Sequence, residues 1–154
     1  MTYNNNGYNP NRNRDSYRSD QNEDLYVRDK QGTILGFKST WIIDGADQDM
    51  IDYTSAAGGK MFDNKLSSSK IRNIFGEIKR IQMGGYEKNK ASFLLLQPKM
   101  AYLVGRDSKN IGIRLFRDIF EKASKLVSDE KTYQNFCNLI EALVAYHRFY
   151  GGKD

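Results

Sequence analysis

Few residues in this chain belong to the types that perform nucleophilic or acid–base chemistry. Among its 154 residues there is one histidine, His147, and one cysteine, Cys137. On a single helix, ten residues would place them about 15 Å apart along the axis, so they cannot form a nucleophile–base pair. His147 also follows Ile140 by seven residues on an apolar stripe, which favours a packed or interface histidine over a general base.

Two other patterns could indicate a bound ion or phosphate, and both lack required residues. An acidic cluster around the start of a predicted helix comprises Asp44, Asp47, Asp49 and Asp52. It lacks the spacing, central glycine and final glutamate of a calcium loop, and acids at a helix start are favoured by its positive end. The string Ala57-Gly58-Gly59-Lys60 resembles part of a phosphate-binding loop, but Thr54 and Met61 stand where that motif needs a glycine and a hydroxyl. We therefore expect no catalytic residue, no metal and no cofactor, which disfavours a nuclease.

Basic residues are more informative. At 100° per residue, Arg72 and Lys79 lie on one stripe of a predicted helix, with Gly76 near the line between them. A glycine inside a helix costs about 1 kcal/mol relative to alanine, and close approach by another backbone is one reason to keep it. A phosphodiester strand between Arg72 and Lys79 would use that gap. The alternative is a solvated basic face beside a packing glycine.

Other cations and the net charge extend this pattern. Lys99 and Arg106 repeat the seven-residue spacing on the next segment, and Arg148 shares a helix face with Glu141. The chain has 24 Lys+Arg and 19 Asp+Glu, a formal net charge of +5. Residues 1–24 hold three arginines and four acids, so the remaining 21 bases and 15 acids leave the rest at +6. This charge suits a polyanionic partner such as nucleic acid.

Helices must position these side chains. Apolar residues at helical spacing predict five helices, over 47–62, 67–83, 87–106, 110–127 and 130–150. Ser67 or Ser68 is suited to cap the second helix and Gly84-Gly85 to end it. The third is apolar on most sides, as a central helix would be, and Pro98 predicts a kink or break near Gln97. The predicted fold class is all-α, a compact five-helix bundle.

The N-terminal region differs from the helical part. Residues 1–24 hold no aliphatic side chain after the first methionine, which predicts a disordered tail. Residues 25–43 carry β-branched and aromatic side chains around two glycines and predict a short hairpin or an ordered strap. We therefore divide the chain into a low-complexity tail or strap, 1–35, and a helical domain, 36–152.

The chain also carries signals about its compartment. Its polar N-terminus cannot form the apolar core of a signal peptide, and the densest apolar run, Phe93–Leu96, is too short to cross a bilayer. A single cysteine excludes an internal disulfide. We expect a cytoplasmic protein without a membrane partner.

Three stretches of the helical region carry a family resemblance. They are Lys65-Leu-Ser-Ser-Ser-Lys-Ile-Arg-Asn73, Leu96-Gln-Pro-Lys-Met-Ala-Tyr-Leu-Val-Gly-Arg106, and the segment from Phe136 through Glu141-Ala-Leu-Val-Ala-Tyr-His-Arg-Phe-Tyr-Gly-Gly152. In order and approximate spacing, over about residues 46–152, they resemble the small subunit of type III-A CRISPR effector complexes, the Csm small subunit. Residues 1–33 match no part of the family pattern.

The resemblance implies a non-catalytic helical subunit present in several copies along a ribonucleoprotein. In the family, these copies form an inner filament beside the guide-binding backbone subunits and below the large signalling subunit. They hold the duplex of crRNA and target RNA, while the backbone subunits cut the target. Family RNA contacts carry over to seven basic residues of this chain: Lys65, Lys70, Arg72, Lys79, Lys99, Arg106 and Arg148.

Two functions remain open from the sequence. In the first, Arg72, Lys79 and Arg106 line a shallow positive groove that binds the RNA backbone without reading its sequence. In the second, the chain is a helical scaffold whose charge is incidental. Exposed Phe149 and Tyr150 and the stripe around His147 would then carry the interactions.

Overall fold

The computed structural model describes residues 25–151. Two short strands precede the helices: β1 (Tyr26–Arg28) and β2 (Ile34–Gly36). The helices are α2 (Thr40–Ile43), α3 (Gln48–Asp63), α4 (Ser68–Gly84), α5 (Lys90–Leu94), α6 (Leu96–Arg106), α7 (Ile111–Ser124) and α8 (Glu130–Phe149). The predicted all-α bundle is confirmed, with α3, α4, α6, α7 and α8 as its long helices. The expected disordered tail, 1–24, lies outside the described residues.

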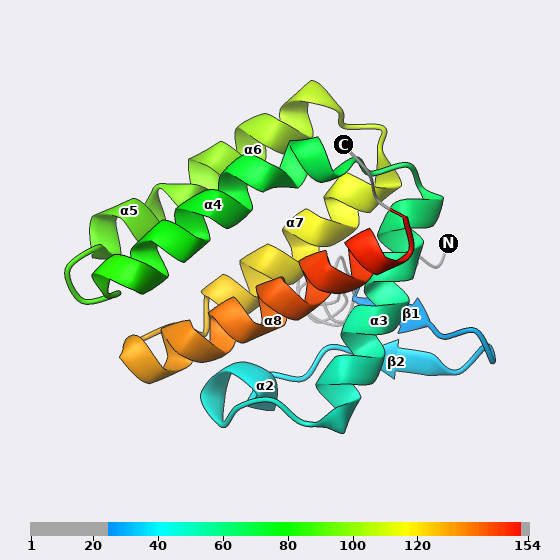
Figure 1. Cartoon of the computed structure of the whole chain (residues 1–154), viewed down its shortest axis with the longest axis horizontal. Coiled ribbons are helices and arrows are strands. Elements are labelled where there is room, and N and C mark those ends of the chain that lie inside the picture. Colours follow the sequence, from blue (N-terminus) through cyan, green and yellow to red (C-terminus); the bar gives the residue numbers. More distant parts are fainter. Residues whose placement is uncertain (1–24, 152–154) are drawn as a thin grey trace, which may run out of the picture.

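Helix α4 occupies the position that matters for function. It packs against α6 on one flank and α8 on the other, while α3 crosses α8 at a steep angle (Figure 1). Its buried positions follow the predicted helical spacing and include Ile71, Ile74, Ile78 and Ile81. This stripe buries one face, so the polar residues of α4 lie along its two flanks and its outer surface.

Aromatic contacts connect the helices of the core. The Phe136 ring of α8 lies edge-on to Phe93 at 5.7 Å and to Phe120 at 5.6 Å between centroids. The Tyr133 hydroxyl donates a hydrogen bond to the Ile78 carbonyl at 2.6 Å, which joins α8 to α4. Because such rings bury large areas in a defined geometry, they fix the separation of α5, α7 and α8, and the Tyr133 hydrogen bond ties α4 to them.

Helix ends agree in part with the sequence. Asp47 caps α3 by accepting the backbone N–H of Met50 at 2.9 Å, which confirms a structural role for this acid. Gly85, at φ 94°, ends α4 as expected. Ser67 occupies the N-cap position of α4, but its hydroxyl bonds to the Ser69 hydroxyl at 3.1 Å rather than to the helix backbone.

The N-terminal hairpin prediction is confirmed. β1 and β2 pair antiparallel, with Val27 opposite Leu35, and the connecting turn uses Gly32 at φ 83°. Leu25 and Val27 are buried in the core, and the Tyr53 hydroxyl donates a hydrogen bond to the Leu25 carbonyl at 2.8 Å. These residues therefore pack on the helical bundle, while the proposed domain boundary at 35/36 stays a prediction.

The break predicted near Gln97 in the third predicted helix is confirmed, but the central position expected for this helix is not. The helix breaks at Leu95 into α5 and α6, and Pro98 lies in the first turn of α6, where its missing N–H costs nothing. The expectation of a central helix was wrong, because α6 buries only one face. Leu95 and Tyr102 are 57% and 68% exposed, while Met100 is buried.

Candidate nucleic-acid interface

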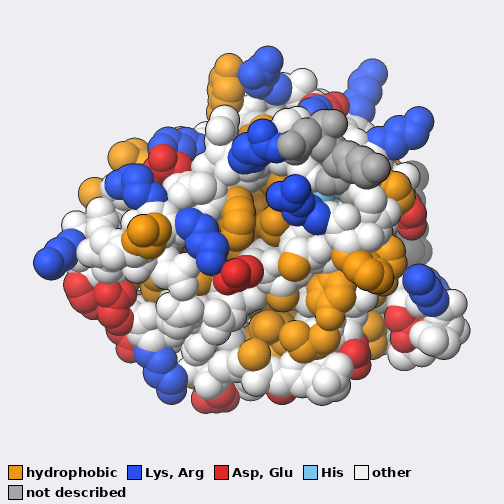
Figure 2. All heavy atoms as spheres, viewed as in Figure 1, with side chains coloured by type: hydrophobic (Ala, Val, Ile, Leu, Met, Phe, Trp, Pro, Cys, Tyr) orange, Lys and Arg blue, Asp and Glu red, His pale blue; other side chains and the backbone are white. Residues whose placement is uncertain are grey.

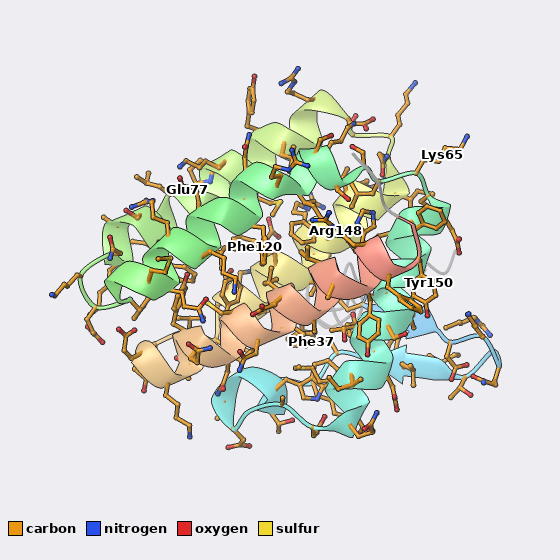
Figure 3. The ribbon with its side chains drawn as sticks, in the orientation of Figure 1. Phe37, Lys65, Glu77, Phe120, Arg148 and Tyr150 are labelled. Atoms are coloured by element: carbon orange, nitrogen blue, oxygen red, sulfur yellow. The ribbon has the colours of Figure 1, made fainter. Side chains whose placement is uncertain are left out.

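The flank of α4 that faces α8 forms a groove of about 230 Å³. From α4 its lining includes Ile71, Arg72 and Phe75, and from α8 it includes Glu141, Val144 and Arg148. On this face of the molecule, Lys and Arg side chains lie above the central apolar side chains and at their left and right, and an acidic side chain lies below them (Figure 2). Arg148 extends from α8 into the space between the two helices (Figure 3). Two guanidinium groups from different helices therefore border one apolar floor.

Lys79 lies beside the same groove, where it contacts two of the residues that line the groove. Its ammonium Nζ lies 3.1 Å from the Glu141 carboxylate and 5.6 Å from the centre of the Phe75 ring. The lysine and glutamate side chains are 38% and 52% exposed. Ion pairs at such exposure contribute about 0–1 kcal/mol, so a phosphate can replace Glu141 at little cost.

The other flank of α4, toward α6, carries a second set of cations. Lys70 forms an ion pair with Asp107, the residue that ends α6. Lys99 of α6 lies 3.7 Å from the Glu77 carboxylate. Arg80 lies 2.8 Å from that carboxylate, and its hydrogen bond is the main reason that the pKa of Glu77 is lowered. These cations form exposed ion pairs rather than buried ones.

The outer face of α6 adds a residue that sequence reasoning missed. The guanidinium of Arg106 lies 5.8 Å from the centre of the Tyr102 ring, and that ring is largely exposed. Tyr102 stands three residues after Lys99 and four before Arg106, so all three share one face. This spacing could have identified an aromatic residue between two cations, but the segment was expected to be buried.

The seven predicted RNA-binding residues lie in two groups, and Lys65 lies apart from both. Arg72, Lys79 and Arg148 lie at the α8 flank of α4, whereas Lys70, Lys99 and Arg106 lie toward or on α6. Lys65 lies in the α3–α4 loop at φ 62° and points away from the groove (Figure 3). Of the three residues predicted to line one groove, Arg72 lines the α4–α8 groove, Lys79 lies beside it and Arg106 lies on α6, so their joint contact with one RNA stays a prediction.

Gly76 lies between the two flanking cations on exposed α4 surface. A Cβ built at Gly76 would meet nothing within 4 Å, so the alternative of a packing glycine was wrong. Gly58 is the contrasting case, since a Cβ there would lie 2.7 Å from the backbone nitrogen of His147. Gly58, part of the string that resembled a phosphate-binding loop, therefore allows the close approach of α3 and α8 where they cross.

The two reactive residue types occupy the interior. His147 is fully buried, and its ring Nε2 lies 2.5 Å from the Leu66 carbonyl, which confirms a packed histidine. Burial raises the pKa of the Cys137 thiol to about 11, so it carries little thiolate at neutral pH. Within residues 25–151, no three His, Cys, Asp or Glu side chains group as metal ligands. Nor does any helix of that part have the length and apolar character needed to cross a membrane.

These features define a small α-helical protein with cationic surfaces on both flanks of one helix. The sequence matches the family model described as Csm2 Type III-A over residues 45–153. It is 36% identical over 107 residues to the CRISPR system Cms protein Csm2 of Streptococcus thermophilus, covering 60% of this chain and 82% of that relative. No solved structure matches the chain. The chain therefore belongs to the Csm2 type III-A family, the small subunit of type III-A CRISPR effector complexes, which confirms the resemblance seen in the sequence.

Proposed function

We propose that this subunit binds RNA without cutting it, and that copies of it form an inner filament that holds the crRNA–target RNA duplex. The observation that carries the proposal is the placement of Arg72 and Arg148 on opposite sides of the α4–α8 groove, with Lys79 beside it. Three cations from two helices offer a polyanion several contacts at once. The net charge of +5 supports the same partner.

Sequence-independent contact follows from the chemistry of these groups. A guide can have any sequence, so a subunit that serves every guide must contact phosphates rather than base edges. Arg72 and Arg148 can each donate two hydrogen bonds to one phosphate, which a lysine ammonium does less specifically. Lys79 reaches a phosphate by releasing Glu141, because that ion pair is exposed and weak.

The α6 side supplies further contacts in this proposal. Lys70, Lys99 and Arg106 bind a neighbouring stretch of the same RNA, and Lys65 binds beyond the groove. Each contact is weak alone and falls with salt, because counterions compete for the phosphates. Several copies on one RNA multiply weak contacts into strong retention.

The remaining parts of the proposal concern partners. The chain works in the cytoplasm with crRNA, target RNA and neighbouring copies of itself. It also contacts the guide-binding backbone subunits and the large signalling subunit. Membership of a multi-subunit family supports these partners, and target cutting is assigned to other subunits.

The test is target-RNA retention by the assembled complex at rising salt. Arg72→Ala and Lys79→Ala are each expected to lower retention, and the double variant should lower it further. Arg114→Ala is the matched control, because Arg114 is an exposed cation on α7. Unchanged retention in the double variant, with normal folding and assembly, would refute the proposal.

A scaffold function is the second candidate, favoured by exposed apolar side chains. Phe149 is 77% exposed at the end of α8, and Leu95 lies exposed near the start of α6. Tyr150 was expected to be exposed but is half-buried, with its hydroxyl 3.0 Å from the Ser55 hydroxyl. Retention of the larger subunits after ribonuclease and high salt, lost in Phe149→Ser, would support this function.

A further inference from the structure

The α4–α8 groove has an apolar floor that phosphate contacts alone do not explain. Ile71 and Val144 are buried at the floor, Phe75 is half-buried, and Ala145 contributes its methyl group. A phosphate needs N–H or O–H donors around its oxygens, and these four side chains offer none. The charged donors stand at the border instead, on Arg72 and Arg148, and the Ser68 hydroxyl also lines the groove.

The size of the groove limits its occupant. Its volume of about 230 Å³ lies below the range of about 300–1,000 Å³ typical of pockets for drug-sized ligands. A double helix is far wider than such a groove and keeps its bases stacked inside. A single planar ring with an attached sugar is an occupant of suitable size.

The side chains around the groove match such a ring. Nucleobases that leave a stack bind on aromatic side chains and on arginine planes, and they do so in any sequence because every base has a π-face. Phe75 contributes an aromatic ring to the lining, and Arg72 and Arg148 offer guanidinium groups at the border. The cations also suit the phosphates on either side of an unstacked nucleotide, whereas an apolar protein side chain would have to enter between charged groups.

We infer that the α4–α8 groove holds the base of one unstacked RNA nucleotide, with the flanking phosphates bound by Arg72 and Arg148. This inference rests on the proposed RNA-binding function and extends it from phosphates to a base. Its ligand is therefore RNA with an unpaired or displaced nucleotide, rather than an uninterrupted duplex.

The test compares three RNAs of about 12 nucleotides on the full chain by fluorescence anisotropy at low salt. One is an ordinary single strand, one carries abasic sites at alternate positions, and one is a blunt duplex. We expect the abasic strand and the duplex to bind at least about fivefold more weakly than the ordinary strand, the loss expected for removing one stacked base. Equal binding of the ordinary and abasic strands would overturn the inference.

Variants that fill the groove make the test specific. Ala145→Leu adds bulk from an exposed position of α8 and should remove the preference for the ordinary strand. Ala101→Leu is the control, since Ala101 is exposed on α6. Phe75→Ala should act like Ala145→Leu, and circular dichroism checks its fold.

The outcomes separate this inference from the proposed function. If the parent chain binds the ordinary and abasic strands equally and Arg72→Ala weakens both, the groove binds only phosphates, and the proposed function stands without the inference. If Arg72→Ala and Lys79→Ala together leave target retention by the complex unchanged, the proposed function itself fails. If Ala145→Leu blocks assembly of the complex but leaves RNA binding unchanged, the groove holds a protein segment and the inference is overturned.

Discussion

The ring Nε2 of His147 lies 2.5 Å from the backbone carbonyl oxygen of Leu66. The histidine stands in the last turn of α8, and Leu66 lies two residues before α4 begins. Because a carbonyl only accepts, Nε2 carries the proton. Burial lowers the pKa of the ring, which favours the neutral imidazole with Nδ1 as its unprotonated nitrogen. That Nδ1 is buried and has no hydrogen-bond partner. This bond joins the loop before α4 to the last turn of α8, the two helices that border the groove.

The buried histidine predicts a loss of stability at acid pH. Burial lowers the pKa of His147 in the folded chain, so below about pH 6.5 the unfolded chain binds more protons than the folded one. The stability contributed by the neutral ring is present above that pH and is lost as the pH falls toward the folded-state pKa. Urea unfolding at pH 7.5, 6.5 and 5.5 measures the loss.

His147→Gln is the matched variant for this measurement. Its side-chain amide can still donate to the Leu66 carbonyl but does not titrate in this range. The free energy of unfolding of the variant should therefore fall less than that of the parent between pH 7.5 and 5.5. Parallel pH profiles for the two chains would exclude His147 as the source.

Trp41 predicts that the N-terminal segment stabilises the bundle, although it precedes residue 45, where the family match starts. The indole is buried, packs 5.2 Å from the Tyr53 ring between centroids, and donates from Nε1 to the Asp47 carboxylate at 2.8 Å. Trp41→Ala should lower the free energy of unfolding by about 3–5 kcal/mol, the usual cost of removing a large buried aromatic.

Tyr26→Ala provides the control for Trp41. Tyr26 belongs to the same N-terminal segment but is about half exposed. Its removal should cost well under half of the Trp41 effect in the same denaturant titration. Equal losses would mean that the segment responds as a unit rather than through the tryptophan.

Helical periodicity predicted the bundle because each long helix buries a regular stripe. The isoleucines of α4, such as Ile74 and Ile78, repeat at the required spacing and specify which face turns inward. The pattern does not say which helix packs on each flank of α4, so it could not show that Arg72 and Arg106 lie on different sides of that helix. That separation depends on contacts between residues far apart in the chain.

Two other differences have the same origin. The run around Leu95 and Tyr102 is apolar enough for a central helix, yet no further helix of the described chain covers its outer face. Val27 lies in a three-residue strand and Leu25 comes directly before it, so this stretch is too short for a clear hydrophobic pattern. The Leu25 carbonyl is bound by the Tyr53 hydroxyl of α3, a contact between residues far apart in the chain. Apolar content therefore indicated what can be buried, while tertiary packing decided what is buried.

Gly76 predicts a conflict between stability and RNA binding. A methyl group at this exposed helix position would meet nothing, so Gly76→Ala should raise the free energy of unfolding by about 0.5–1 kcal/mol. If an RNA backbone approaches the helix there, the same variant should lower target retention by the assembled complex. Denaturant titration and retention, measured on one preparation, give both effects.

Gly105→Ala is the control for that experiment. Gly105 lies in α6, and a Cβ there would also meet nothing within 4 Å. It should gain similar stability and keep target retention closer to that of the parent. If Gly76→Ala is more stable than the parent but retains target RNA equally well, no RNA backbone approaches the helix at Gly76.

Glu141 predicts a variant that binds RNA more tightly than the parent. The Glu141 carboxylate forms an ion pair with the Lys79 ammonium at 3.1 Å, and Glu141 also lines the groove. In Glu141→Gln a phosphate no longer competes with the Glu141 carboxylate for the Lys79 ammonium. Retention of target RNA should therefore rise, by up to about fivefold for an exposed ion pair. The free energy of unfolding should fall by less than about 1 kcal/mol.

Glu121→Gln is the control, because Glu121 is an exposed acid of α7 and its substitution makes the same change in net charge. If both variants raise retention equally, net charge is responsible and Glu141 has no local effect on Lys79.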